Sequence, residues 1–313
     1  MKPITLTLAA LLSLAAAAAL AGPLRKGQVP ADAKWLVHLD IDNFLASQLG
    51  GIVSRDLIDK HVARQASELK TKFGIDLDWR KIHGLTAYGV DYKARADSGG
   101  VLILHSDLDI INSLDVVIGI LAATAGENNP LKKLPGEAFP TYALKDKVFG
   151  APLPGNLFVL SRSRQDLDKA CRVIAGKAPN LVSTKALKVF PGASEGFFLL
   201  GIAEAFSEAP WPPQAKILKN ADGGQFVAGE KAGKFYFKLA LSANDADAAA
   251  QIQQVLQGLL ALAALTQDKN KDLQLLTQGT KIGSNDKTVT MEFELPVSAV
   301  MDRVGELSKE HSK

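Results

Sequence analysis

Two segments of the sequence carry a histidine followed by two aspartates at alternate positions. They are His38-Leu39-Asp40-Ile41-Asp42 and His105-Ser106-Asp107-Leu108-Asp109, each where a predicted strand passes into a predicted helix. Because alternate residues of an extended chain share a face, each segment could present an imidazole and two carboxylates together. If the two strands were neighbours, the first His-x-Asp of each segment could form a metal site with mixed nitrogen and oxygen ligands. The residues of this candidate site are His38, Asp40, His105 and Asp107.

The same aspartates also have a structural explanation, which we favour. An aspartate at the start of a helix accepts hydrogen bonds from unpaired backbone N–H groups and suits the positive end of the helix dipole. Asp107 in particular is expected to cap the helix that follows it. We therefore assign no catalytic, cofactor-binding or metal-binding residue, keep the four-residue metal site as the alternative, and expect no cofactor.

Two further motifs resemble functional loops but lack essential parts. The Gly-x-Ser-x-Gly at residues 192–196 has the spacing of a nucleophile elbow, yet that elbow needs a helix after the serine, and here a strand is expected. The glycine-rich run at residues 229–234 lacks the first glycine and the final Ser or Thr of a phosphate-binding loop. Both segments are predicted to be turns.

The N-terminus has the order of a secretory leader. Lys2 supplies a positive charge, an apolar or small stretch follows from residue 4 to residue 20, and Ala19-Leu20-Ala21 has the small-x-small pattern of a cleavage site. We expect residues 1–21 to be removed, the mature protein to lie in the periplasm or outside the cell, and no transmembrane anchor to remain. Cys171 is the single cysteine, so no intramolecular disulfide can form, and it is expected to be buried on a helix face.

Charge argues against nucleic acid as a partner. The chain has 36 Lys and Arg against 33 Asp and Glu, and the two signs are interleaved along the sequence. Phosphate backbones are bound by clustered basic residues, which this pattern does not supply.

The rest of the chain alternates strands, short turns and amphipathic helices in an order that occurs twice. Both halves read β-α-β-β-α-β-β-α, which predicts an internal duplication with lobes at residues 22–178 and 179–313. Strands joined by short turns are antiparallel. We therefore expect an α+β fold with two similar lobes, each an antiparallel sheet with helices packed on one face. A single continuous sheet shared by both halves is the alternative.

One stretch resembles a known group of proteins. The run at residues 73–85, with Gly74-Ile75-Asp76-Leu77 after a long predicted helix and Ile82-His83-Gly84-Leu85 at the start of a strand, is similar to a recurrent segment of uncharacterised exported bacterial proteins, a domain of unknown function. The resemblance implies export and an α+β fold, and it implies no activity.

These observations favour one kind of function. We expect an exported, soluble, non-catalytic protein that binds an unknown protein partner or ligand of the cell envelope. The alternative is an exported metal-dependent enzyme that uses the His-x-Asp segments.

Overall fold

The computed structural model describes residues 24–76, 78–92, 100–125, 129–134, 139–184, 187, 196–265, 277 and 279–301. The predicted leader, residues 1–21, lies outside the described residues, as do residues 192–195 of the Gly-x-Ser-x-Gly motif. The leader and the interpretation of that motif both remain predictions.

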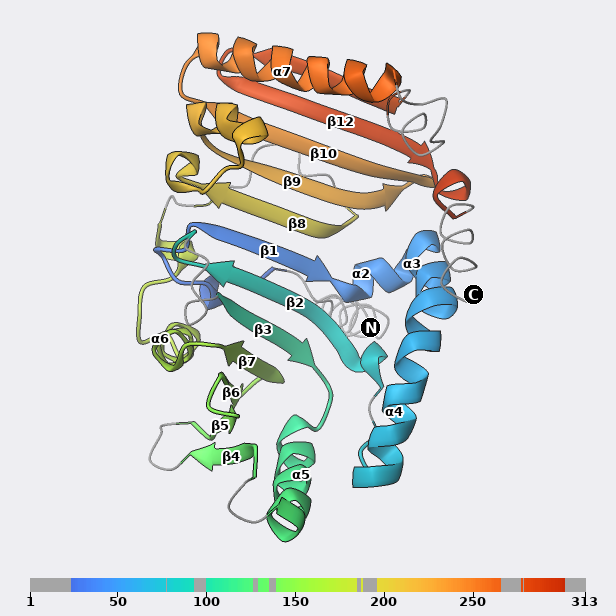
Figure 1. The fold of residues 1–313 in the computed structure, drawn as a ribbon, viewed down its shortest axis with the longest axis vertical. Helices are drawn as coiled ribbons and strands as arrows, with labels where there is room; N and C mark the ends of the chain where they lie inside the picture. Colours follow the sequence, from blue (N-terminus) through green and yellow to red (C-terminus); the bar gives the residue numbers. More distant parts are fainter. Residues whose placement is uncertain are drawn as a thin grey trace, which may run out of the picture.

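The described strands form one antiparallel sheet of twelve strands in the order β11-β12-β10-β9-β8-β1-β2-β3-β7-β6-β5-β4 (Figure 1). The strands of the first half are β1 (Trp35–Asp40), β2 (Ile82–Gly89), β3 (Val101–Ser106), β4 (Leu131–Leu134), β5 (Thr141–Leu144), β6 (Val148–Leu153) and β7 (Leu157–Ser161). Those of the second half are β8 (Phe197–Glu204), β9 (Ala221–Lys231), β10 (Lys234–Ala243), β11 (Thr280–Asn285) and β12 (Thr288–Pro296). The predicted α+β class is confirmed.

The two halves of the chain meet in the middle of the sheet. There β1 pairs with β8, and Trp35 lies opposite Ala203. The halves thus share a single continuous sheet, the alternative considered from the sequence, instead of having separate sheets. The order β8-β9-β10-β12-β11 on one side repeats the order β1-β2-β3-β7-β6 on the other, as a duplication would produce. The lobe boundary at residue 178 stays a prediction.

The helices lie at the ends and on the faces of the sheet. The α-helices are α2 (Ile41–Ala46), α3 (Gln48–Val53), α4 (Asp59–Phe73), α5 (Ile110–Ala125), α6 (Arg164–Ile174) and α7 (Ala246–Leu265). The other helical segments are η1 (Lys26–Gln28), η2 (Ser54–Ile58), η3 (Trp79–Lys81), η5 (Leu181–Ser183), η6 (Phe206–Glu208) and η7 (Pro213–Asn220). Figure 1 shows α2, α3 and α4 following one another along one end of the central strands. Gly74, in the left-handed conformation, ends α4 as its position predicts.

The break in the first long helix falls at a different residue from the one predicted. The sequence suggests Gly50-Gly51, but the structure places both glycines inside α3. Ser47 separates α2 from α3, because its side-chain oxygen accepts a hydrogen bond from the Gly50 amide at 2.9 Å. This N-cap starts a new helix, and a capping serine is a better boundary signal here than the glycine pair.

Helices cover both faces of the twelve-stranded sheet, with α6 of the first half and α7 of the second half on opposite faces. Leu167 of α6 packs in a core with Leu36 and Val159. The pairings across β8 and β9 place Leu36 and Ala240 in one row, so their side chains lie on the same face of the sheet. Leu241, the next residue along β10, points to the opposite face. On that face Ile252 of α7 packs against it. In β7, the successive residues Leu157, Phe158 and Val159 are all buried, so this strand does not alternate apolar with polar.

Helix α7 is the one described helix that is long and apolar enough to cross a membrane, judged by length and composition. Its first turns pack into the core through Ala248, Ala249 and Ile252. Further along, Leu262 and Leu265 are exposed, at 61% and 80%. The prediction that no transmembrane anchor remains after leader cleavage is not decided by this helix.

Candidate functional site

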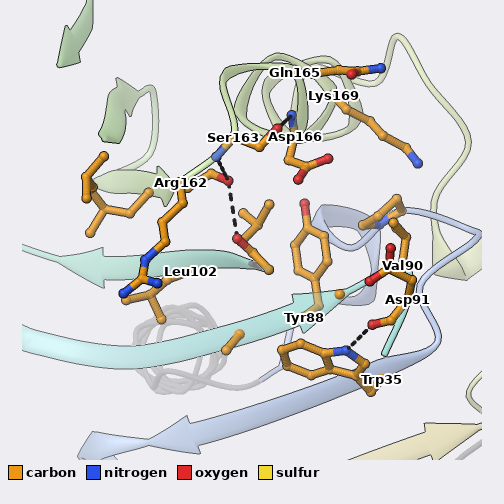
Figure 2. A pocket seen from close by; sticks show the side chains of 18 of the residues that line it. Trp35, Tyr88, Val90, Asp91, Leu102, Arg162, Ser163, Gln165, Asp166 and Lys169 are labelled. Carbon is orange, nitrogen blue, oxygen red and sulfur yellow. Dashed lines mark hydrogen bonds between the residues drawn. The ribbon is translucent and has the colours of Figure 1, made fainter. Parts of the chain in front are cut away.

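A cavity of about 870 Å³ lies at one end of the central strands. It opens where β1 and β3 begin, where β2 and β7 end, and where α6 starts (Figure 2). Apolar and aromatic side chains form much of its wall, and polar side chains of α6 and its preceding loop form the rim. Principal lining residues are Trp35, Tyr88, Leu102, Leu160, Asp166 and Lys169.

The indole of Trp35 is fixed in this cavity by two glycines, Gly89 at the end of β2 and Gly100 just before β3. Trp35 pairs with Gly89 across β1 and β2, and a Cβ atom on Gly89 would lie 2.5 Å from the indole Nε1. A Cβ on Gly100, whose φ is +43°, would lie 3.2 Å from the indole Cη2 and 2.8 Å from the Tyr88 carbonyl oxygen. The indole Nε1 also donates to the Asp91 carbonyl oxygen at 2.9 Å. The ring is therefore held in place before any ligand arrives.

Tyr88 approaches the cavity from the other face of β2. It is 3% exposed, and Figure 2 shows it between Trp35 and Asp166. Burial raises the pKa of its phenol, and the carboxylates of Asp166 and Asp32 and the thiol of Cys171 add to the rise. The phenol stays protonated at neutral pH and keeps a hydrogen to donate.

The rim is built by a short chain of hydrogen bonds at the end of β7. Ser161 Oγ donates to the Gly100 carbonyl oxygen at 3.2 Å and accepts from the Ser163 amide at 3.1 Å. Ser163 Oγ in turn accepts from the Asp166 amide at 3.2 Å and caps α6. These bonds join β3, β7 and α6, so the aromatic floor and the polar rim form one rigid unit.

Charged side chains of both signs lie around the cavity. Lys169 forms an ion pair with Asp32 at 2.6 Å. The other charged side chains of the lining are Asp91, Asp166 and the exposed Arg162. A wall of this kind gives contact area to apolar parts of a small molecule and hydrogen bonds to its polar parts. Its volume lies in the range of ordinary small-molecule sites, about 300–1,000 Å³.

The structure brings three of the four predicted metal-site residues to one face of the sheet. His38 is fully buried, with Nδ1 2.9 Å from Thr86 Oγ1. Asp40 and His105 lie in one row on either side of Gly84. Asp40 caps α2 by accepting from the Asn43 amide at 2.9 Å, and burial raises the pKa of its carboxyl. Burial is also the main reason that the pKa of His105 is lowered to about 4.

Asp107 does not join them. It lies beyond the end of β3, where its Oδ2 is 3.0 Å from His83 Nε2. Across the described ranges, no group of three or more His, Cys, Asp or Glu side chains is placed to hold a metal ion. The expectation that Asp107 caps α5 is wrong, because Asp109 does so by accepting from the Asn112 amide at 3.3 Å.

Sequence reasoning missed a histidine held between two carboxylates. His83 Nδ1 lies 3.1 Å from both Oδ1 and Oδ2 of Asp42, while Nε2 faces Asp107. The pairing of β2 with β3 shifts register between Ile82 and Gly84, so His83 stands in a β-bulge. Bulges redirect a side chain and depend on the partner strand, so nothing in the local sequence signals this site.

The other chemical motifs are structural. Residues 229–234 form the end of β9, a turn with Ala232 and Gly233 at positive φ, and the start of β10, as predicted. Cys171 is buried, and burial raises the pKa of its thiol to about 11, so it is not an activated thiolate.

Comparisons with known proteins give distant structural neighbours. No family model and no curated protein matches the sequence. Crystal forms I, III and IV of TP0453 are similar in structure, with TM-scores of 0.46, 0.48 and 0.44 and sequence identities of 10%, 10% and 9%. The matches cover 92%, 90% and 89% of this chain and 98%, 97% and 95% of those chains.

Proposed function

We propose that the protein is an exported, non-catalytic binding protein whose cavity beside Trp35 and α6 holds a small, partly apolar ligand of the cell envelope. One observation carries the proposal: a cavity of about 870 Å³ whose indole is fixed against Gly89 and Gly100 before binding. A fixed aromatic wall gives contact area at a low entropic cost.

The chemistry of the lining supports binding over catalysis. The described lining contains no histidine and no cysteine. The hydroxyl oxygens of Ser161 and Ser163 both accept backbone N–H groups, which ties them to the local fold. A serine nucleophile would need an adjacent base to take its proton. The positions of the candidate ligands disfavour the metal-dependent alternative, because Asp107 lies apart from His38, Asp40 and His105.

Export is part of the proposal and rests on the order of residues 1–21. The intact mass of the natural protein tests it directly. A chain that begins at residue 22 supports export, and a chain that retains residues 1–21 contradicts it.

The cavity is tested with 1-anilinonaphthalene-8-sulfonate, a probe with aromatic rings and one polar group. We expect saturable fluorescence enhancement with the native protein and an affinity at least tenfold weaker in Trp35→Ala. The matched control is Trp79→Ala, since Trp79 lies outside the lining and donates to Asp59 Oδ1 at 3.0 Å. Equal affinity in the two variants would refute the site. Near-ultraviolet circular dichroism confirms that binding comes from the folded state.

A further inference from the structure

His83 has a carboxylate on each of its two ring nitrogens. Asp42, in the first turn of α2, lies at Nδ1, and Asp107, after β3, lies at Nε2. A neutral imidazole has one N–H, whereas an imidazolium has two. Both contacts can therefore be hydrogen bonds only when His83 is protonated, because the neutral ring turns a lone pair toward one of the two carboxylates.

The surroundings of the imidazole determine which contact is lost on deprotonation. Asp107 has a second donor, Asn156 Nδ2, which lies 2.7 Å from its Oδ1. The Asp107 side chain is also 57% exposed, against 30% for Asp42. A neutral ring that donates from Nδ1 to Asp42 leaves each carboxylate with a donor. In the opposite tautomer the proton is on Nε2, so Nδ1 would turn a lone pair toward Asp42 and the hydrogen bond from His83 to Asp42 would be lost.

The two carboxylates beside the ring favour its protonated form. Burial disfavours the imidazolium, but the hydrogen bonds and charges of Asp42 and Asp107 outweigh it, so the pKa of His83 is raised above 6.5. Two further titratable groups lie in this region. Lys81, before β2, helps to lower the pKa of Asp107. His105, on β3, interacts electrostatically with His83, which lowers the pKa of His105. Asp40 stands beside Asp42 on the same helix start.

We propose that His83 is a pH-sensitive latch: as an imidazolium it ties Asp107 to Asp42 across the bulge in β2, and as a neutral ring it keeps Asp42 and releases Asp107. The release weakens the end of the β2–β3 pair. There the Asp107 amide donates to the Lys81 carbonyl oxygen at 2.8 Å, and Ile82 pairs with Ser106.

Hydrogen exchange and imidazole nitrogen shifts, measured by NMR across pH 5 to 9, test the latch. We expect His83 to titrate above 6.5, and the neutral ring to carry its proton on Nδ1. The Asp107 amide should exchange at least fivefold faster above this titration, after correction against amides of α6.

Two variants and a control complete the test. Asp107→Asn should lower the pKa of His83, and His83→Gln should abolish the pH step in the exchange of the amide of residue 107. Glu68→Gln, which removes a carboxylate from the exposed Arg64–Glu68 pair, should change neither. If His83→Gln does not fold, Asp107→Asn alone decides. A proton on Nε2 in the neutral ring, titration of His83 at or below 6.5, or an unchanged step in His83→Gln would overturn the proposal.

Discussion

The indole of Trp35 lies against the backbone of Gly89 across the β1–β2 pair, so closely that any side chain on Gly89 would displace it. The contact joins two strands at the wall of the cavity. It also explains why a glycine ends β2: the space that a Cβ would take is occupied by the ring.

Gly89→Ala should therefore disturb the cavity without touching its charged rim. We expect the affinity for 1-anilinonaphthalene-8-sulfonate to fall several-fold, and the free energy of unfolding to fall by about 1–3 kcal/mol, because the indole must shift. The control is Gly51→Ala, where a Cβ meets nothing within 4 Å and helix propensity should raise stability by up to about 1 kcal/mol. Titration of the probe and urea unfolding measure both effects. Equal probe affinities and equal free energies of unfolding in the two variants would show that the contact between Trp35 and Gly89 is unimportant.

His105 should make the fold sensitive to acid. Its pKa is lowered to about 4 in the folded state, mainly by burial, with Arg25, His38 and His83 adding to the effect. The unfolded chain takes up this proton near pH 6.5. The contribution of His105 to stability is thus complete above pH 6.5 and is lost as the pH falls toward 4, by about 3 kcal/mol.

Urea unfolding at pH 7.5 and pH 4.5 measures this loss. His105→Gln should show a smaller loss between the two pH values than the native protein. His83 acts in the opposite direction, because its raised pKa gives stability that is lost as the pH rises through that pKa. The two histidines are therefore distinguished by the sign with which the free energy of unfolding changes with pH. A loss of stability in acid that is identical in the native protein and in His105→Gln would exclude this role of His105.

Leu167 should be essential to the attachment of α6. Its side chain is fully buried in the core cluster under the cavity. Leu167→Ala should lower the free energy of unfolding by about 2–5 kcal/mol, through lost burial and the cavity left behind. Val182→Ala is the control, since Val182 is 72% exposed and its loss should cost at most about 0.5 kcal/mol. Similar midpoints in denaturant for both variants would contradict the packing of α6.

Cys171 should be unreactive in the folded protein. It is 7% exposed, and burial raises the pKa of its thiol to about 11, so little thiolate is present at pH 8. We expect an aromatic disulfide reagent to label it slowly under native conditions and rapidly in denaturant. Fast labelling of the folded protein would contradict the position of Cys171 in the core.

Local features of the sequence predicted much of the local structure. Gly74 ends α4 and the run at residues 229–234 is a hairpin turn, because each depends on a few adjacent residues. The pairing of β1 with β8 was not predicted, because it joins residues more than 150 positions apart. The strand β4, Leu131–Leu134, was missed as well: it is short, and two of its residues are lysines.

Register explains why neither site was found from the sequence. Trp35, Gly89 and Gly100 meet only once three strands are aligned, and a shift by one residue would turn the indole to the other face. His83 reaches Asp42 and Asp107 only because a bulge frees it from the ladder. The His-x-Asp repeats drew attention to this region, but which aspartate meets which histidine depends on that bulge.

We propose the cavity beside Trp35 as the binding site, and the three tryptophan indoles provide its most direct test. Each indole N–H has its own partner: Trp35 donates to the Asp91 carbonyl oxygen, Trp79 to Asp59 and Trp211 to the Phe206 carbonyl oxygen. In a ¹H–¹⁵N spectrum recorded during titration with 1-anilinonaphthalene-8-sulfonate, we predict that the Trp35 signal shifts to saturation while the other two stay in place. A stationary Trp35 signal, with probe bound and either of the other indoles shifting, would contradict the account.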